Sequence, residues 1–223
     1  MTWTLLHHPS TPGSRKVRVA LSELGLGCQI ELESYWLRRP EFTNLNVASE
    51  VPVLVLDDGS AVVGDQAICE FLDEVKPDRT LLGPSLEQRS ETRRLLQWFD
   101  QKFAREVTDN IAGEKLVKRL MRNGETYAPV IRAGIANIHY HLDYIGWLCE
   151  RRSWLAGHEF SLADIAAAAH ISLIDYLGDV PWTDHEDART WYMRVKSRPS
   201  FRPLLTETMA GVTPAEHYAL LDF

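Results

Sequence analysis

Cysteine is scarce in this chain, and its few copies are far apart. Among 223 residues there are three, Cys28, Cys69 and Cys149. An odd number at wide spacing argues against a disulfide framework and a structural zinc site, and it indicates a reducing compartment. No CxxC pair is present, so each cysteine is predicted to be a small buried hydrophobic residue. His139 and His141 lie two apart on a predicted helix and diverge, so we expect no metal site.

Long apolar runs and an excess of positive charge are also missing. No run approaches the roughly 18 apolar residues of a membrane-spanning helix. Lys and Arg number 24 against 31 Asp and Glu, a net charge of −7. This balance disfavours nucleic acid as a partner, because a duplex needs a positively charged surface. The first ten residues lack the basic and apolar segments of a secretory signal. We therefore expect a cytoplasmic protein with no transmembrane segment.

The first third of the chain alternates predicted strands and helices. Apolar residues make up 45% of the chain and charged residues 25%, as in folded globular proteins. Apolar residues at i, i+3, i+4 and i+7 predict helices beginning near Pro12 and Ile68. Asp58-Gly59 is a strong hairpin signal. Four short segments are rich in β-forming residues, which predicts strands and an α/β unit with a mixed sheet. They are residues 2–7, 28–33, 53–56 and 61–63.

Capping residues mark several helix starts. Thr11 is predicted to cap the first helix, with Pro12 at its first position. Ser161 and Asp164 precede an apolar run and predict a capping box in which Asp replaces the usual Glu.

The second part of the chain is predicted to be entirely helical. Gly83 and Pro84 interrupt the earlier pattern, and the stripes that follow repeat at helical spacing. We expect an N-terminal domain over 1–81, a linker over 82–87, a helical domain over 88–210 and a tail over 211–223.

An α/β unit of this size joined to a helical unit resembles the cytosolic glutathione transferase superfamily. Five motifs carry the resemblance, in the family's order. They are Arg15–Leu21, Asn46–Leu54, Gly64–Ile68, Gly157–Asp164 and Trp191–Pro199. The resemblance implies a thioredoxin-like N-terminal domain, an all-α C-terminal domain, a cis bond before Pro52 and a homodimer.

The resemblance also locates a candidate catalytic hydroxyl. The family activates the thiol of glutathione at the N-terminus of the first helix, where amides and the helix dipole stabilise a thiolate. Thr11 matches that place and Ser14 is a second candidate. We expect the Thr11 side chain to cap the helix rather than face a ligand.

The glutathione-binding edge of the family matches four residues here. They are Val51, Pro52, Asp65 and Gln66. The family has Ser where this chain has Gln66, and that Ser holds a carboxylate of glutathione at a helix N-terminus. The longer Gln66 side chain must fill that place or turn away, and we expect it to fill the place. Glutathione is thus the candidate substrate, and no cofactor is predicted.

Two sequence patches predict a partner-binding surface. The first contains Trp36, Arg38 and Arg39, since Trp and Arg are frequent in binding hot spots. Its alternative is that Trp36 packs on its own loop or on a second subunit. The second patch is a helical stripe of basic residues, whose alternative is a solvated face with a Glu114–Lys118 pair. It consists of Lys115, Lys118, Arg119 and Arg122.

The apolar C-terminal tail is a third candidate. Leu221, Asp222 and Phe223 end a segment too apolar to be simply solvated. The tail either folds back onto its own domain or docks a partner.

These patches support a narrower resemblance, to transferase-like bacterial division proteins that bind the FtsZ filament. It implies a non-catalytic dimeric scaffold recruited to the division site. The alternatives are an active glutathione transferase or glutathione-dependent isomerase, and a glutathione-binding stress protein with peroxidase activity. The peroxidase interpretation is disfavoured because the first helix does not begin with a cysteine.

Overall fold

The computed structural model describes residues 3–223, so Met1 and Thr2 of the predicted N-terminal segment lie outside the described residues. The chain divides into two compact units, Met1–Leu81 and Leu82–Phe223. Within residues 3–223, no helix has both the length and the apolar character needed to cross a membrane.

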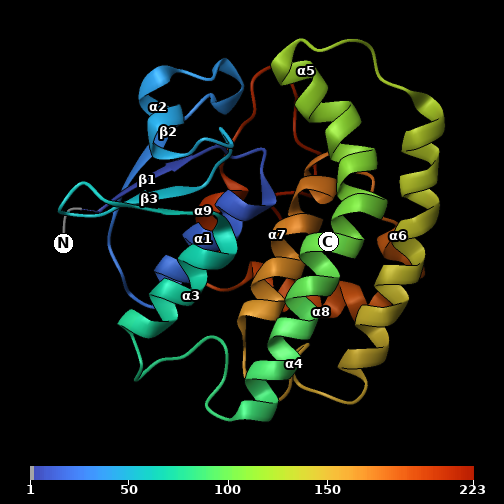
Figure 1. The fold of residues 1–223 in the computed structure, drawn as a ribbon. Coiled ribbons are helices and arrows are strands. Elements are labelled where there is room, and N and C mark those ends of the chain that lie inside the picture. Colours follow the sequence, from blue (N-terminus) through green and yellow to red (C-terminus); the bar gives the residue numbers. More distant parts are fainter. Residues whose placement is uncertain (1–2) are drawn as a thin grey trace. The chain divides into compact units, whose positions relative to one another are not determined.

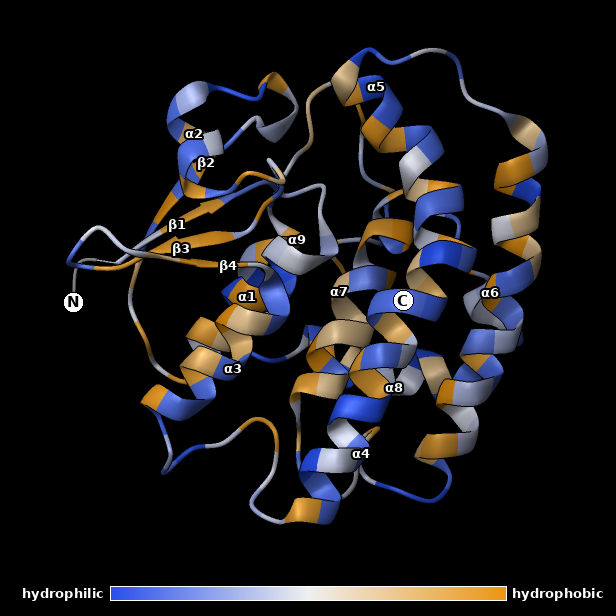
Figure 2. Ribbon diagram, in the orientation of Figure 1, coloured by the Kyte–Doolittle hydropathy of each residue, from blue (hydrophilic) through white to orange (hydrophobic). Residues whose placement is uncertain are grey.

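The first unit is built on a four-stranded mixed sheet. Its strands are β1 (Thr4–His7), β2 (Gln29–Leu32), β3 (Val53–Val55) and β4 (Ala61–Val63). Their order is β2-β1-β3-β4, with β1 parallel to β2 and the other two pairings antiparallel. The predicted strands and the β3–β4 hairpin are confirmed. Figure 2 shows β1 and β3 as mainly hydrophobic, as expected for strands within a core.

Helices flank this sheet. They are α1 (Pro12–Glu23), the short 3₁₀ turn η1 (Tyr35–Leu37), α2 (Pro40–Leu45) and α3 (Asp65–Val75). α1 and α3 pack against each other on one face of the sheet (Figure 1). Their predicted apolar stripes are buried, as Val17 and Ile68 show. The Val51–Pro52 bond is cis, as predicted.

The regular elements of the second unit are helices, and two isolated β-bridges lie in its loops. α4 (Leu86–Gln97), the π-helical η2 (Trp98–Val117) and α5 (Lys118–Met121) follow one another without a break. The remaining elements are α6 (Ala128–Cys149), α7 (Leu162–Tyr176), the 3₁₀ turn η3 (Trp182–Asp184), α8 (Glu186–Lys196) and α9 (Arg202–Leu205). Every residue of α7 is buried, because a helix that is apolar on all sides belongs at the centre of a bundle.

Capping and burial test two further predictions. The Ser161–Asp164 capping box is confirmed, with the Ser161 amide donating to Asp164 Oδ2 at 3.0 Å.

The prediction that all cysteines are buried is right for Cys69, whereas Cys28 and Cys149 are half-buried. Both lie at element ends, where apolar contacts cover only one side of a residue.

Candidate functional site

The hydroxyls at the start of α1 bond to one another and to the loop before the helix. Thr11 stands at the N-cap position, but its side chain makes no cap hydrogen bond. Its Oγ1 lies 2.7 Å from Ser14 Oγ and 3.1 Å from the carbonyl oxygen of His8. Ser14 is fully buried and accepts the His8 amide at 3.2 Å. The expected cap by the Thr11 side chain is therefore wrong, because its hydroxyl bonds to Ser14 and to the His8 carbonyl instead.

A buried polar network beside these hydroxyls was not predicted. His8 Nδ1 lies 2.7 Å from Ser10 Oγ, and both residues are buried. The rings of Tyr35 and Trp36 meet the His8 ring edge-on, with centroids 6.1 and 5.0 Å away. Burial lowers the pKa of His8 to about 4, so its imidazole is neutral at pH 7. Sequence spacing gives no signal for this contact, because tertiary folding brings η1 to the loop.

The start of α3 shows how the candidate glutathione edge is occupied. Asp65 forms an ion pair with Lys16 at 2.5 Å, and the Lys16 side chain is 1% exposed. The carboxylate of Asp65 is therefore directed toward a buried cation of the same unit. The Gln66 side chain is exposed, and its Nε2 donates to Glu70 Oε1 at 3.1 Å. The expectation that Gln66 fills the ligand-carboxylate position is wrong, since a partner one helical turn away holds its amide.

Pro52 lies at the same edge. Its carbonyl oxygen accepts the Gly64 amide at 3.2 Å, which joins the loop before β3 to the start of α3. Val51 is half-buried beside it. This hydrogen bond places Pro52 beside Gly64, the residue immediately before Asp65 and Gln66.

The Tyr35–Pro40 loop exposes both apolar and cationic groups. Trp36 is half-buried against His8, whereas Leu37 is 63% exposed. Arg39 forms an ion pair with buried Glu33. Arg38 is exposed, and it has no ion pair with any residue of the described chain. Leu37 and Arg38 thus present an exposed apolar side chain next to an exposed cation.

The basic stripe is partly neutralised by its own unit. Lys115 contacts Asp179 at 2.6 Å, and Lys118 contacts Glu114 at 2.7 Å. Arg119 and Arg122 are exposed and form no ion pair within residues 3–223. Two of the four predicted cations are therefore available as free charges.

The C-terminal tail folds back onto the helical unit. Tyr218 is 1% exposed, and its hydroxyl donates to the Leu204 carbonyl at 3.0 Å. The Phe223 ring lies 4.2 Å from the Nζ of buried Lys196. Leu221 and Asp222 border a shallow groove of about 510 Å³. Of the two predicted arrangements, the structure shows packing on the same unit.

Comparison with known proteins places this geometry in a family. Residues 11–75 match the family model of the glutathione S-transferase N-terminal domain. "FtsZ-localized protein A" of Caulobacter vibrioides is 47% identical over 223 residues, covering 99% of this chain and 98% of its own. The chain belongs to the FtsZ-localized protein A family of glutathione S-transferase-like proteins.

Solved structures agree with this membership. A glutathione S-transferase from Rhodospirillum rubrum F11 matches with a TM-score of 0.98 and 53% identity, over 100% of both chains. FzlA from C. crescentus matches with a TM-score of 0.96 and 46% identity, again over 100% of both. The predicted fold, an α/β unit followed by a helical unit, is confirmed.

Proposed function

We propose that this chain is a non-catalytic, dimeric scaffold that binds FtsZ filaments during bacterial cell division. The observation that carries the proposal is 47% identity over the full length of FtsZ-localized protein A. The proposed scaffold is cytoplasmic, recruited to the division site by FtsZ, and needs no cofactor.

The Asp65–Lys16 ion pair supports a role without transferase chemistry. One carboxylate oxygen of Asp65 is held by Lys16, whose side chain is 1% exposed, so a ligand amino group would have to share this carboxylate with a buried cation. The Gln66 side chain adds no contact at this place, because its amide is bonded to Glu70.

The Tyr35–Pro40 loop is the proposed apolar contact with the filament. Trp36 gives the loop a rigid base, and exposed Leu37 and Arg38 present an apolar surface beside a free cation. Aromatic and Arg residues surrounded by apolar contacts are typical of binding hot spots. Arg39 positions the loop through Glu33.

The basic stripe and the tail complete the proposed surface. Arg119 and Arg122 would attract an acidic partner, while Lys115 and Lys118 are held by carboxylates of the same unit. Leu221, Asp222 and Phe223 would contribute the folded tail as a rigid edge rather than as a free peptide.

Co-sedimentation with FtsZ polymers tests the scaffold. Leu37→Asp and Trp36→Ala should weaken binding with little salt dependence, because they remove apolar contact. Arg122→Asp should weaken it and make the remainder less sensitive to salt, since an exposed charge acts through screened electrostatics. Leu86→Asp, at a leucine that is 82% exposed in α4, is the matched apolar control. Arg132→Asp, at an exposed arginine of α6, is the charge control.

Failure of the parent protein to co-sediment would contradict the proposal. So would equal binding by all three test variants, once each is shown to be folded.

An active glutathione transferase or isomerase using Thr11 or Ser14 is the second candidate. The 53% identity to a protein described as a glutathione S-transferase favours it. Thermal unfolding with glutathione separates the two, because a ligand at 100 times its dissociation constant stabilises by about 2.7 kcal/mol. The scaffold proposal predicts no shift.

A further inference from the structure

The edge strand β2 is exposed along its whole length. In the sheet order it has β1 on one side and, among residues 3–223, no strand on the other. All four of its residues are exposed, and two of them are large and apolar. The side chains of Ile30 and Leu32 are 50% and 65% exposed. An open edge strand of this kind is a ready template for pairing with a further strand.

The backbone of β2 has hydrogen-bonding groups left for such a strand. The amides of Gln29 and Glu33 donate at 2.8 Å to carbonyl oxygens at the two ends of β1. The parallel ladder to β1 therefore uses the odd-numbered residues, and the N–H and C=O groups of Ile30 and Leu32 point away from it. Within the described residues, no backbone hydrogen bond is made by these outward groups. Each outward residue thus offers one donor and one acceptor to an added strand.

The side chains of β2 indicate the charge of the strand that fits. Ile30 and Leu32 share one face of the sheet, and Glu31 lies between them on the opposite face. Glu31 is exposed and has no ion pair within the part of the chain that the structure describes. A basic residue directly opposite Glu31 stabilises the pairing of two strands, whereas an acidic residue weakens it. The complementary sequence is therefore a basic residue between two apolar ones.

A second copy of this chain does not meet that requirement. Two β2 strands can pair antiparallel about a two-fold axis, so that Ile30 of each copy lies opposite Leu32 of the other. This register covers the apolar residues of both copies, but it places the two Glu31 side chains directly opposite one another. Like charges in this position destabilise a sheet pair. The charge of the edge thus selects a different, basic partner.

We propose that the β2 edge binds an extended basic segment of a partner protein, which joins the sheet as a fifth strand. The backbone groups of Ile30 and Leu32 supply the hydrogen bonds, and their side chains supply the apolar contact. Glu31 selects the basic residue. In this mode of recognition, main-chain bonds give affinity and side chains give specificity. The contact does not use the Tyr35–Pro40 loop assigned to FtsZ, so the inference goes beyond the proposed function.

A charge exchange between peptide and protein tests the site. The probes are two fluorescently labelled peptides, Thr-Val-Lys-Val-Thr and Thr-Val-Glu-Val-Thr, titrated with the full chain and followed by anisotropy. The parent should bind the lysine peptide saturably and about fivefold more tightly than the glutamate peptide. Glu31→Lys should reverse this preference, because the favourable cross-strand pair is then formed by the glutamate peptide.

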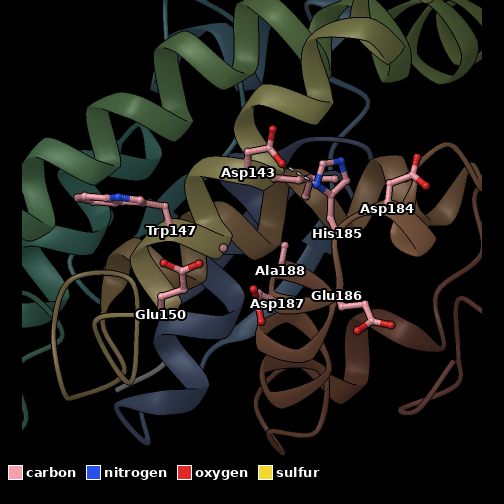
Figure 3. Close-up of a pocket in the computed structure, with 10 residues that line it drawn as sticks. Asp143, Trp147, Glu150, Asp184, His185, Glu186, Asp187 and Ala188 are labelled. Atoms are coloured by element: carbon pink, nitrogen blue, oxygen red, sulfur yellow. Dashed lines mark ion pairs between the residues drawn. The ribbon is translucent and has the colours of Figure 1, made fainter.

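Two carboxylates elsewhere provide matched controls. Glu74 is an exposed residue of α3 in the same unit as β2. Glu186 belongs to the helical unit, where it borders the pocket of about 220 Å³ shown in Figure 3. This pocket is lined by several carboxylates and by no lysine or arginine, so it is the place where a basic peptide would collect by charge alone. Glu74→Lys and Glu186→Lys should both keep the preference of the parent.

Backbone NMR of the parent provides a reading that does not depend on how well the variants fold. Saturation with the lysine peptide should shift the amides of Ile30 and Leu32, because their outward N–H groups become donors to the added strand. The amide of Val63, in the other edge strand β4, should keep its position. Equal affinity for the two peptides, a preference unchanged in Glu31→Lys, or peptide shifts that spare Ile30 and Leu32 would overturn the proposal.

Discussion

Asp164 joins a loop, the start of α7 and helix α8 through one carboxylate. Its Oδ1 accepts the Leu155 amide and the Trp191 indole N–H, both at 2.9 Å. Its Oδ2 accepts the amide and the hydroxyl of Ser161, at 3.0 and 2.9 Å. The side chain is fully buried, so each donor depends on it for a partner.

Asp164→Ala should lower the free energy of unfolding by about 3 kcal/mol or more, because it leaves buried donors without an acceptor. Ser85→Ala, which removes the capping box of α4, is the matched control and should cost about 1 kcal/mol. Urea denaturation measures both. A loss for Asp164→Ala no larger than that of the control would contradict the prediction.

The stability of the folded protein should decrease in acid because of two buried histidines, His7 and His8, at the end of β1. Burial lowers the pKa of both His7 and His8 from 6.5 to about 4, and Arg18 contributes at His7. The unfolded chain then binds protons below pH 6.5 that the folded chain does not bind until about pH 4. Stability is therefore present above pH 6.5 and falls as the pH drops through this window, by up to about 3 kcal/mol per histidine.

The urea midpoint measured across this pH range checks the prediction. His8→Gln removes one titrating group, so the urea midpoint of this variant should change less with pH than that of the parent. His158→Gln, at an exposed histidine of the helical unit, should show the same pH dependence as the parent. A midpoint that is constant between pH 6.5 and 4 would contradict the assignment.

At the scale of elements, local sequence was sufficient for most of the helices and strands, and the family resemblance supplied the fold. The segments rich in β-forming residues, the Asp-Gly hairpin and the Ser161–Asp164 box each depend on residues close together in the chain, and all three are confirmed. The contacts that decide the candidate sites join distant segments. Lys16 meets Asp65, and His8 meets Trp36. No spacing rule reports such pairs, because they form only when the chain folds.

The tail is an element whose role can now be predicted from packing. Deleting residues 218–223 removes two packed aromatic side chains, Tyr218 and Phe223, and exposes Lys196. We expect the deletion to lower the free energy of unfolding by about 3 kcal/mol, which corresponds to a melting temperature lower by about 6–12 °C. Leu220→Ala, at a side chain that is 52% exposed, is the control and should change it little. An unchanged melting temperature in the deletion variant would show that the tail does not stabilise the helical unit.

At the scale of the whole molecule, the proposed function depends on a dimer. Two copies of each binding patch would let one molecule contact two FtsZ subunits, so that avidity adds to a modest affinity at each patch. Closed two-fold symmetry is the commonest arrangement of homo-oligomers. Light scattering at micromolar concentration should therefore give twice the chain mass of 25.4 kDa. A mass equal to that of one chain would contradict the dimer.

Mixed dimers distinguish binding to one FtsZ filament from bridging between two filaments. When parent chains exchange subunits with an excess of the Leu37→Asp/Arg122→Asp double variant, most parent chains end up in mixed dimers. Each mixed dimer has one chain with intact patches and one chain without them. These dimers should still co-sediment with FtsZ polymers, more weakly than the parent, but should no longer bundle filaments, because one functional copy cannot join two of them. Leu86→Asp/Arg132→Asp chains are the exchange control and should leave bundling intact. If the mixed dimers bundle filaments as well as the parent does, bridging does not depend on two copies of these patches, and the filament contact lies elsewhere on the molecule.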